Sequence, residues 1–181
     1  MHNDSATHAS TPSDEASPAP APAAASNGEG DPRTLAIVSC TGPGLSTPSR
    51  GREHFTSPLF RELCTFAERQ AGRWFLLSAA HGLVDPDDVI MPMASVIHRK
   101  DAAARQSWSA RVIEQLAPHL VGVERVLLLA NARSREYLVD FLRQDGRTVE
   151  IPLEGLSLGE QLQWLRRQPQ PPHGSDAPHD L

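Results

Sequence analysis

Leu35-Ala-Ile-Val-Ser-Cys40 is the stretch that decides the fold, because it is a short apolar run that ends in two small residues. Such a run, with no alternation of polar residues, is typical of a strand buried on both faces. Residues 74–78 and 125–130 repeat the pattern. Residues 148–151 carry more polar side chains and are expected at an edge of the sheet. The sequence therefore predicts about four strands.

A helix is expected after each of these strands. The helices begin near Ser57-Pro58, Asp101, Asn131 and Leu158, with Ser57 and Asp101 as N-caps. Strands that alternate with helices form parallel sheets with right-handed crossovers. We therefore predict an α/β fold: a three-layer sandwich with a mainly parallel sheet and helices on both faces. The apolar stripes of the helices and strands place all three tryptophans in the core, and Leu158, Leu162 and Leu165 line the last helix with Trp164.

Composition divides the chain of 181 residues into one domain and two tails. Residues 1–32 contain eight Ala, five Pro and five Ser, and Met1 is their only large apolar residue. Such a segment cannot bury enough surface to offset the entropy lost on ordering. Prolines interrupt residues 169–181 in the same way. The prediction is a single domain at 33–168 between two disordered tails that are dispensable for folding.

Charge is distributed unevenly along the chain. The formal net charge is −5, but residues 33–167 hold all 17 basic residues against 15 acidic ones, a formal charge of +2. With a nearly neutral domain and an acidic N-terminal tail, we expect only weak attraction to nucleic acid. Sixteen of the basic residues are Arg, which reflects either genome composition or phosphate recognition.

The sequence contains no signal for a metal, a cofactor or a membrane. Cys40 and Cys64 lack metal-ligand spacing, and two cysteines do not form a secreted disulfide framework. No apolar run reaches the roughly 18 residues of a membrane helix, and the N-terminus lacks a signal-peptide core. We expect a cytoplasmic protein without a cofactor. The sequence does not determine its oligomeric state.

Ligands of open α/β sheets bind outside the carboxyl ends of the strands. Three loops leave these ends, at residues 39–44, 78–85 and 130–135, and a turn with Glu154 follows the fourth strand. His81 is the candidate acid–base group, with Asp85 near enough in sequence to orient it. The alternative is a histidine that only packs locally. The candidate substrate-binding residues are Ser39, Cys40, Thr41, Ser57, Ser78, Gly82, Asn131, Arg133 and Glu154.

Several of these residues have a second interpretation. Cys40 is either a nucleophile or, more commonly, a buried apolar residue. Residues 41–44 could hold an anion through backbone N–H groups, although no Walker motif is present. Ser57 marks either an anion site or an ordinary N-cap. Arg133 or Arg135 holds a phosphate or carboxylate, or simply begins a solvated helix.

The same motifs resemble a bacterial family of uncharacterised α/β domains, and the resemblance spans nearly the whole domain. The matching segments are Ser39-Cys40, Phe-Thr-Ser-Pro-Leu-Phe at 55–60, Ser-Ala-Ala-His-Gly-Leu at 78–83, Asp-Pro-Asp at 85–87 and Gly-Glu-Gln-Leu-Gln-Trp-Leu at 159–165. That family is similar to the α/β domain of archaeosine synthase and, more distantly, to the uracil-DNA-glycosylase-like fold. The resemblance implies nucleobase or nucleic-acid chemistry.

Two hypotheses follow. In the first, the protein is an enzyme that cleaves or exchanges an N-glycosidic bond of a nucleobase, nucleoside or modified nucleic acid, with His81 and Asp85 as its catalytic groups. In the second, it is a non-catalytic ligand- or nucleotide-binding module. The second draws on two departures from the family pattern: Ala80 replaces a lysine, and Thr41-Gly-Pro-Gly44 replaces a lysine-containing loop. A scaffold recruited through its tails has no motif in support.

Overall fold

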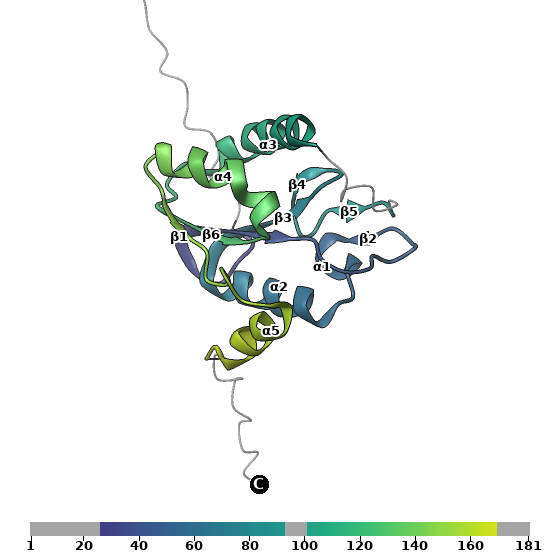
Figure 1. The fold of residues 1–181 in the computed structure, drawn as a ribbon. Helices are drawn as coiled ribbons and strands as arrows, with labels where there is room; N and C mark the ends of the chain where they lie inside the picture. The colour runs from purple at the N-terminus through teal and green to yellow at the C-terminus, as the bar shows by residue number, and fades with distance from the viewer. Residues whose placement is uncertain (1–25, 93–100, 170–181) are drawn as a thin grey trace, which may run out of the picture.

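The computed structural model describes residues 26–92 and 101–169. Its centre is a five-stranded sheet in the order β4-β3-β1-β6-β7 (Figure 1). Four strands are parallel: β1 (Asp31–Ser39), β3 (Ala71–Ser78), β6 (Arg125–Leu129) and β7 (Thr148–Glu150). The fifth strand, β4 (Gly82–Val84), is antiparallel to β3. The predicted α/β class is confirmed.

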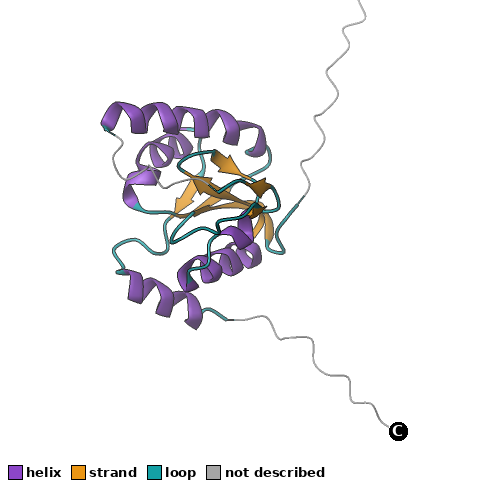
Figure 2. Ribbon diagram, turned by 90° about the vertical axis from the view of Figure 1, so that its right-hand side faces the viewer, coloured by secondary structure: helices purple, strands orange, loops and turns teal. Residues whose placement is uncertain are grey.

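Helices cover both faces of this sheet (Figures 1 and 2). On one face lie α2 (Pro58–Gln70) and α5 (Leu158–Arg167). On the other lie α3 (Ala102–Leu116), continued by the short 3-10 helix η2 (Ala117–His119), and α4 (Ala132–Gln144). Side-chain caps begin all four long helices, at Ser57, Asp101, Asn131 and Ser157. The last of these is a complete capping box with Glu160.

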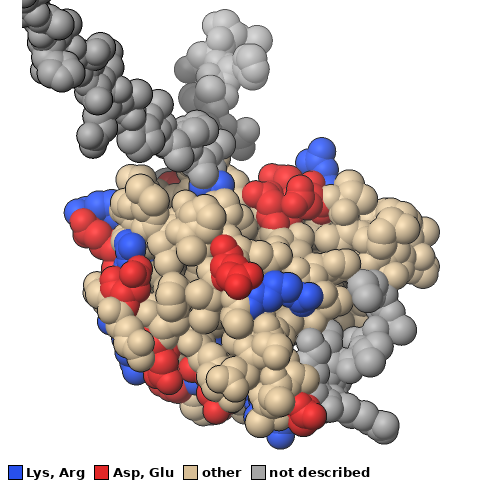
Figure 3. Space-filling model, turned by 90° about the horizontal axis from the view of Figure 1, so that it is seen from above, with Lys and Arg blue, Asp and Glu red and all other residues tan. Residues whose placement is uncertain are grey.

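The sheet separates two apolar clusters. Ala36 and Val38 of β1 pack with α2 and α5, whereas Leu35 and Ile37 pack with α3 and α4. All four side chains are fully buried, as expected of a strand covered on both faces. Among the described residues, no helix is long and apolar enough to span a bilayer. On the face that carries α3 and α4, acidic and basic side chains lie interspersed (Figure 3).

Four short elements lie in segments that composition predicts to be irregular. They are β2 (Ser49–Arg50), α1 (Gly51–His54), β4, and β5 (Val89–Ile90), which pairs with β2. Elements of two to four residues leave no recognisable period in a sequence. Leu158, which the sequence places on the apolar line of the last helix, is the first residue of α5 and is 71% exposed. Trp164 and Leu165 of α5 pack in the cluster that contains α2, and Leu165 is buried.

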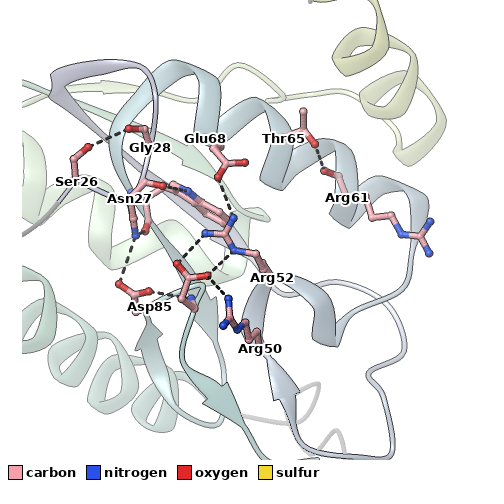
Figure 4. A network of polar contacts seen from close by, with 11 residues as sticks. Ser26, Asn27, Gly28, Arg50, Arg52, Arg61, Thr65, Glu68 and Asp85 are labelled. Atoms are coloured by element: carbon pink, nitrogen blue, oxygen red, sulfur yellow. Dashed lines mark hydrogen bonds and ion pairs between the residues drawn. The ribbon is translucent and has the colours of Figure 1, made fainter. Parts of the chain in front are cut away.

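Residues 26–32, which composition assigns to the N-terminal tail, are ordered in the structure. Asn27 binds the free edge of β3 beyond the reach of β4: its Oδ1 accepts from the backbone N–H of Trp74 at 2.8 Å, and its Nδ2 donates to the Trp74 carbonyl at 2.9 Å (Figure 4). Backbone bonds from Gly28, Glu29 and Gly30 reach the end of α2 and the start of β3. The amide of Asn27 thus satisfies strand groups that would otherwise lack a partner.

An arginine on α1 joins this region to α2. The guanidinium of Arg52 binds Glu68 at 3.0 Å and both carboxylate oxygens of Asp87, and it lies 5.3 Å from the ring centroid of Trp74 (Figure 4). Because its side chain is only 27% exposed, this network is shielded from water more than a surface ion pair is. It holds the short elements α1, β2 and β5 against the domain.

We expect Asn27→Ala to destabilise the domain by about 1–3 kcal/mol, because it leaves the Trp74 backbone groups without their partners. Urea denaturation measures the change. Glu29→Ala is the matched control, since Glu29 contributes through its backbone N–H and its side chain is exposed. Equal stability of the two variants would show that the segment does not hold the edge of β3.

Candidate functional site

The order of the strands creates a switch point between β1 and β6. The chain leaves β1 for α2 on one face of the sheet, and leaves β6 for α4 on the other face. A crevice forms at the carboxyl ends of two such strands, and this is where open α/β sheets bind ligands. The loops after β1, β3 and β6 all begin at this edge, as the sequence predicts.

The loop after β1 is fixed against the start of α2. Ser57 caps α2 by accepting from the N–H of Phe60 at 3.1 Å, and its hydroxyl donates to the Thr41 carbonyl at 3.1 Å. Gly42 has φ +91, and a Cβ there would lie 2.8 Å from the Cβ of Ser57. Only glycine allows this close approach. Thr41 Oγ1 is buried and has no partner among the described residues.

Cys40 and Ser39 belong to the core side of this loop. Ser39 is buried, and Cys40 packs against the α2–α5 cluster. Burial raises the pKa of the Cys40 thiol to about 12. The thiol is therefore protonated near neutral pH, and the geometry favours the interpretation of Cys40 as a packed residue over that of a nucleophile.

The turn after β3 is held by α3. Ser78 Oγ accepts from the backbone N–H groups of Ala80 and His81 at 3.3 and 3.2 Å. Gln115 closes the turn, since its Nε2 donates to the His81 carbonyl and its Oε1 accepts from the N–H of Leu83. Gly82 adopts φ +80, and a Cβ there would lie 2.2 Å from Gln115 Oε1. The backbone is fixed, while the His81 side chain is exposed.

The structure does not bring His81 and Asp85 together. β4 pairs Gly82 with Ser78 and Val84 with Leu76, so the chain runs back along β3 after His81. At the rise of a strand, Asp85 lies about 10 Å down the sheet from Gly82. There Asp85 accepts from the backbone N–H of Asp87 and lies 3.5 Å from Asn27 Nδ2. His81 thus lacks the acidic partner that the sequence proposes for it.

His54, which sequence reasoning missed, lies on the same side as His81. It is buried, its Nδ1 lies 2.7 Å from the Ser49 hydroxyl, and a Cβ on Gly44 would lie 2.8 Å from its Nε2. Burial lowers the pKa of His54, and the charge of His81 lowers it further. His54 ends α1, a helix of four residues, so no periodic pattern marks it in the sequence.

Arginines at the start of α4 line a cavity at the surface of the domain. Asn131 caps α4 through Ser134, and Arg135 donates to the Ala130 carbonyl at 3.2 Å and to Glu154 at 2.6 Å. The Arg135 side chain is only 12% exposed, whereas that of Glu154 is 64% exposed. The cavity is an open groove of about 500 Å³ lined by Ala132, Arg133, Arg135, Glu136, Val139, Asp140, Arg143, Ile151 and Glu154.

Of the predicted binding residues, Ser39 and Cys40 pack toward the core, and Asn131 caps α4. The other six divide into two groups. Arg133 and Glu154 line the groove beside α4. Thr41, Ser57, Ser78 and Gly82 shape the loops after β1 and β3 through their backbone and cap contacts. Within residues 26–92 and 101–169, no group of three or more His, Cys, Asp or Glu could hold a metal ion.

Fold and site together define a doubly wound α/β domain with a polar strand-end groove. Residues 35–167 match the model of a family of unknown function, DUF6884, and the chain belongs to this family. The resemblance to an uncharacterised domain family is thereby confirmed. No curated protein and no solved structure matches the chain.

We expect the pH dependence of stability to report on His54. Its pKa is lower in the folded protein, so below about pH 6.5 the unfolded chain binds more protons and stability falls as pH falls. His119, whose pKa burial also lowers, contributes in the same direction. Denaturation at a series of pH values from about 7.5 to 5.5 should show a smaller loss for His54→Gln than for the wild type.

The control is His81→Gln, which removes only the smaller electrostatic contribution to the pKa of His54. It should therefore flatten the pH dependence less than His54→Gln does. An unchanged slope in His54→Gln would contradict the burial of a neutral His54.

Proposed function

We propose that this domain binds a small anionic ligand of nucleotide type at the carboxyl edge of its sheet, in the groove that begins at α4. The observation that carries the proposal is the placement of Arg135, held between the Ala130 carbonyl and Glu154 at the end of β6, with Arg133 exposed beside it. Guanidinium groups bind phosphate oxygens in a planar, paired geometry. The nucleotide class rests on the sequence resemblance to nucleobase-processing domains.

Glu154 and two other acidic residues balance the charge of the arginines that line the groove. Three Arg and three acidic residues line it, and the shortest ion pair is that of Arg135 with Glu154, at 2.6 Å. An incoming phosphate would compete with the Glu154 carboxylate for the same guanidinium. Because Glu154 is exposed, its side chain can turn to solvent at small cost. Glu154 therefore limits the affinity of the groove for anions rather than creating it.

The first test compares nucleoside monophosphates with the corresponding nucleosides by calorimetric titration of the full chain. We expect the phosphates to bind more tightly. Arg135→Gln should weaken their binding by roughly tenfold or more, as expected when a charged hydrogen bond is lost. Glu154→Gln should strengthen it, because the guanidinium is released from its competitor.

Arg147→Gln is the matched control, since Arg147 pairs with Asp145 beyond the other end of α4. Equal affinity for a nucleoside and its phosphate, or no binding of either, would overturn the proposal.

A second candidate function is cleavage or exchange of an N-glycosidic bond. The observation in its favour is the pair of histidines beside the loop after β1: His54 is buried with a lowered pKa, and His81 is exposed near it. A neutral imidazole can act as a base, and an exposed one can reach a substrate. Against it stands the separation of Asp85 from His81. Binding without turnover therefore fits the geometry better.

His81→Ala separates the two functions. The His81 side chain makes no hydrogen bond to a described residue, so the variant should keep its stability to within about 0.5 kcal/mol. If the protein is an enzyme, the variant loses release of free base from nucleosides or DNA while phosphate binding in the groove persists. Gln163→Ala, at an exposed position on α5, is the control. A large drop in melting temperature with unchanged ligand behaviour would make His81 structural.

A further inference from the structure

A second cavity lies beside β3 and β4, at the other edge of the sheet from β7 and the groove. It has a volume of about 330 Å³, near the lower limit for small-molecule sites. Arg73 on β3 lies five residues before Ser78, about 16 Å from the carboxyl edge at the rise of a strand. The cavity is bounded by β3, β4, the turn after β4 and η2, and it is lined by Arg73, Phe75, Leu83, Asp85, Asp88, Gln115 and His119.

Two polar atoms in this cavity lack partners. Arg73 Nε and His119 Nδ1 are buried, and no described residue forms a hydrogen bond with either. Buried donors and acceptors are normally paired, so each unpaired one calls for an explanation such as a bound ligand. Gln115 does not supply the partner, because both ends of its amide are used to hold the His81–Leu83 turn.

The same two residues pack against one buried ring. The Arg73 guanidinium lies 5.2 Å from the centroid of Phe75, and the His119 ring lies 4.6 Å from it. Phe75 is 3% exposed and Leu83 half-buried, so they form an apolar floor. The stacking orients a guanidinium and an imidazole in a fixed position, as a site for a carboxylate requires.

The turn after β4 contributes two carboxylates. Asp85 is held by the backbone N–H of Asp87 at 3.0 Å, and Asp88 donates its own backbone N–H to the Asp85 carbonyl at 3.1 Å. Asp85 acts electrostatically on both Arg73 and His119, yet neither carboxylate comes within 4.0 Å of these groups in an ion pair among the described residues. Opposite charges therefore line one cavity without neutralising each other directly.

We propose that this cavity binds a free α-amino acid, with its carboxylate at Arg73 and His119 and its ammonium group at Asp85 and Asp88. An inorganic anion would face two carboxylates, and a simple amine would face the guanidinium, whereas a zwitterion satisfies both. The small volume and the floor of Phe75 and Leu83 suit a short side chain. This site shares no lining residue with the groove beside α4, and its ligand is of a different class from the proposed nucleotide.

The experiment uses the full chain and the free L-amino acids, screened by thermal shift and then titrated by calorimetry. We expect at least one amino acid to bind, and its N-acetyl and amide derivatives, which each remove one charge, to bind at least tenfold more weakly. Arg73→Gln and Asp85→Asn should each lower the affinity at least tenfold. Binding of inorganic phosphate or of ethylamine as tightly as the amino acid would overturn the proposal, as would the absence of amino-acid binding.

Matched controls come from the groove beside α4. Arg143→Gln and Asp140→Asn remove like charges there and should leave amino-acid binding unchanged. Arg135→Gln, which tests the nucleotide proposal, should do the same, so each proposal can fail without the other.

A measurement on the wild-type protein covers the case in which the variants fold poorly. The charged groups that line the cavity with His119 are Arg73 from β3 and Asp85 and Asp88 from the turn. A carboxylate bound at His119 favours the imidazolium, so the NMR titration of His119 should move to higher pH when the amino acid is present. A titration that the amino acid leaves unchanged places it elsewhere and overturns the assignment.

Discussion

Burial of β1 on both faces is the constraint on which the rest of the molecule depends. Its side chains alternate between the two apolar clusters, so each helix layer packs on residues adjacent in the chain. The register of β1 with β3 on one side and β6 on the other aligns the carboxyl ends of the three strands. Because these strands are parallel and in register, the polar loops that follow them begin at one edge of the sheet. The groove lies to one side of the loops after β1 and β3, between α4 and the segment of Ile151 and Glu154 that follows β7.

The same arrangement explains why hydrogen bonds hold the backbone at this edge while two of the candidate side chains stay exposed. Caps and side-chain amides from the helices hold the loops: Ser57 fixes the loop after β1, and Gln115 fixes the turn after β3. His81 and Arg133 carry little of the fold and remain exposed. A ligand would therefore find donors in defined positions, and ordering of the main chain would not reduce its affinity.

The backbone groups at the outer edge of β3 are paired in two different ways. β4 pairs with only the last three residues of β3. At Trp74, earlier in β3, the side-chain amide of Asn27 forms the two hydrogen bonds to the backbone that a neighbouring strand would form. The chain reverses direction at β4. This reversal places Asp85 and Asp88 beside Arg73 and His119, on the face of the sheet that carries α3. The shortness of β4 thus has two consequences. It leaves backbone groups of β3 that the N-terminal segment must pair, and it places four charged or titratable side chains in one cavity, away from the groove beside α4.

Local patterns in the sequence determined the α/β class, the four parallel strands, the helix starts and the polar loops at the strand ends, because apolar runs and caps act over a few residues. They also place Arg133 and Glu154 at the edge where the groove lies. The tertiary structure alone decided which side chains meet. Asp85 is four residues from His81 in the chain but lies with Arg73 and His119, because the pairing of β4 with β3 sets the direction of the chain. Asn27 and His54 became visible only in three dimensions, since their partners Trp74, Ser49 and His81 are fixed by packing and leave no periodic trace in the sequence.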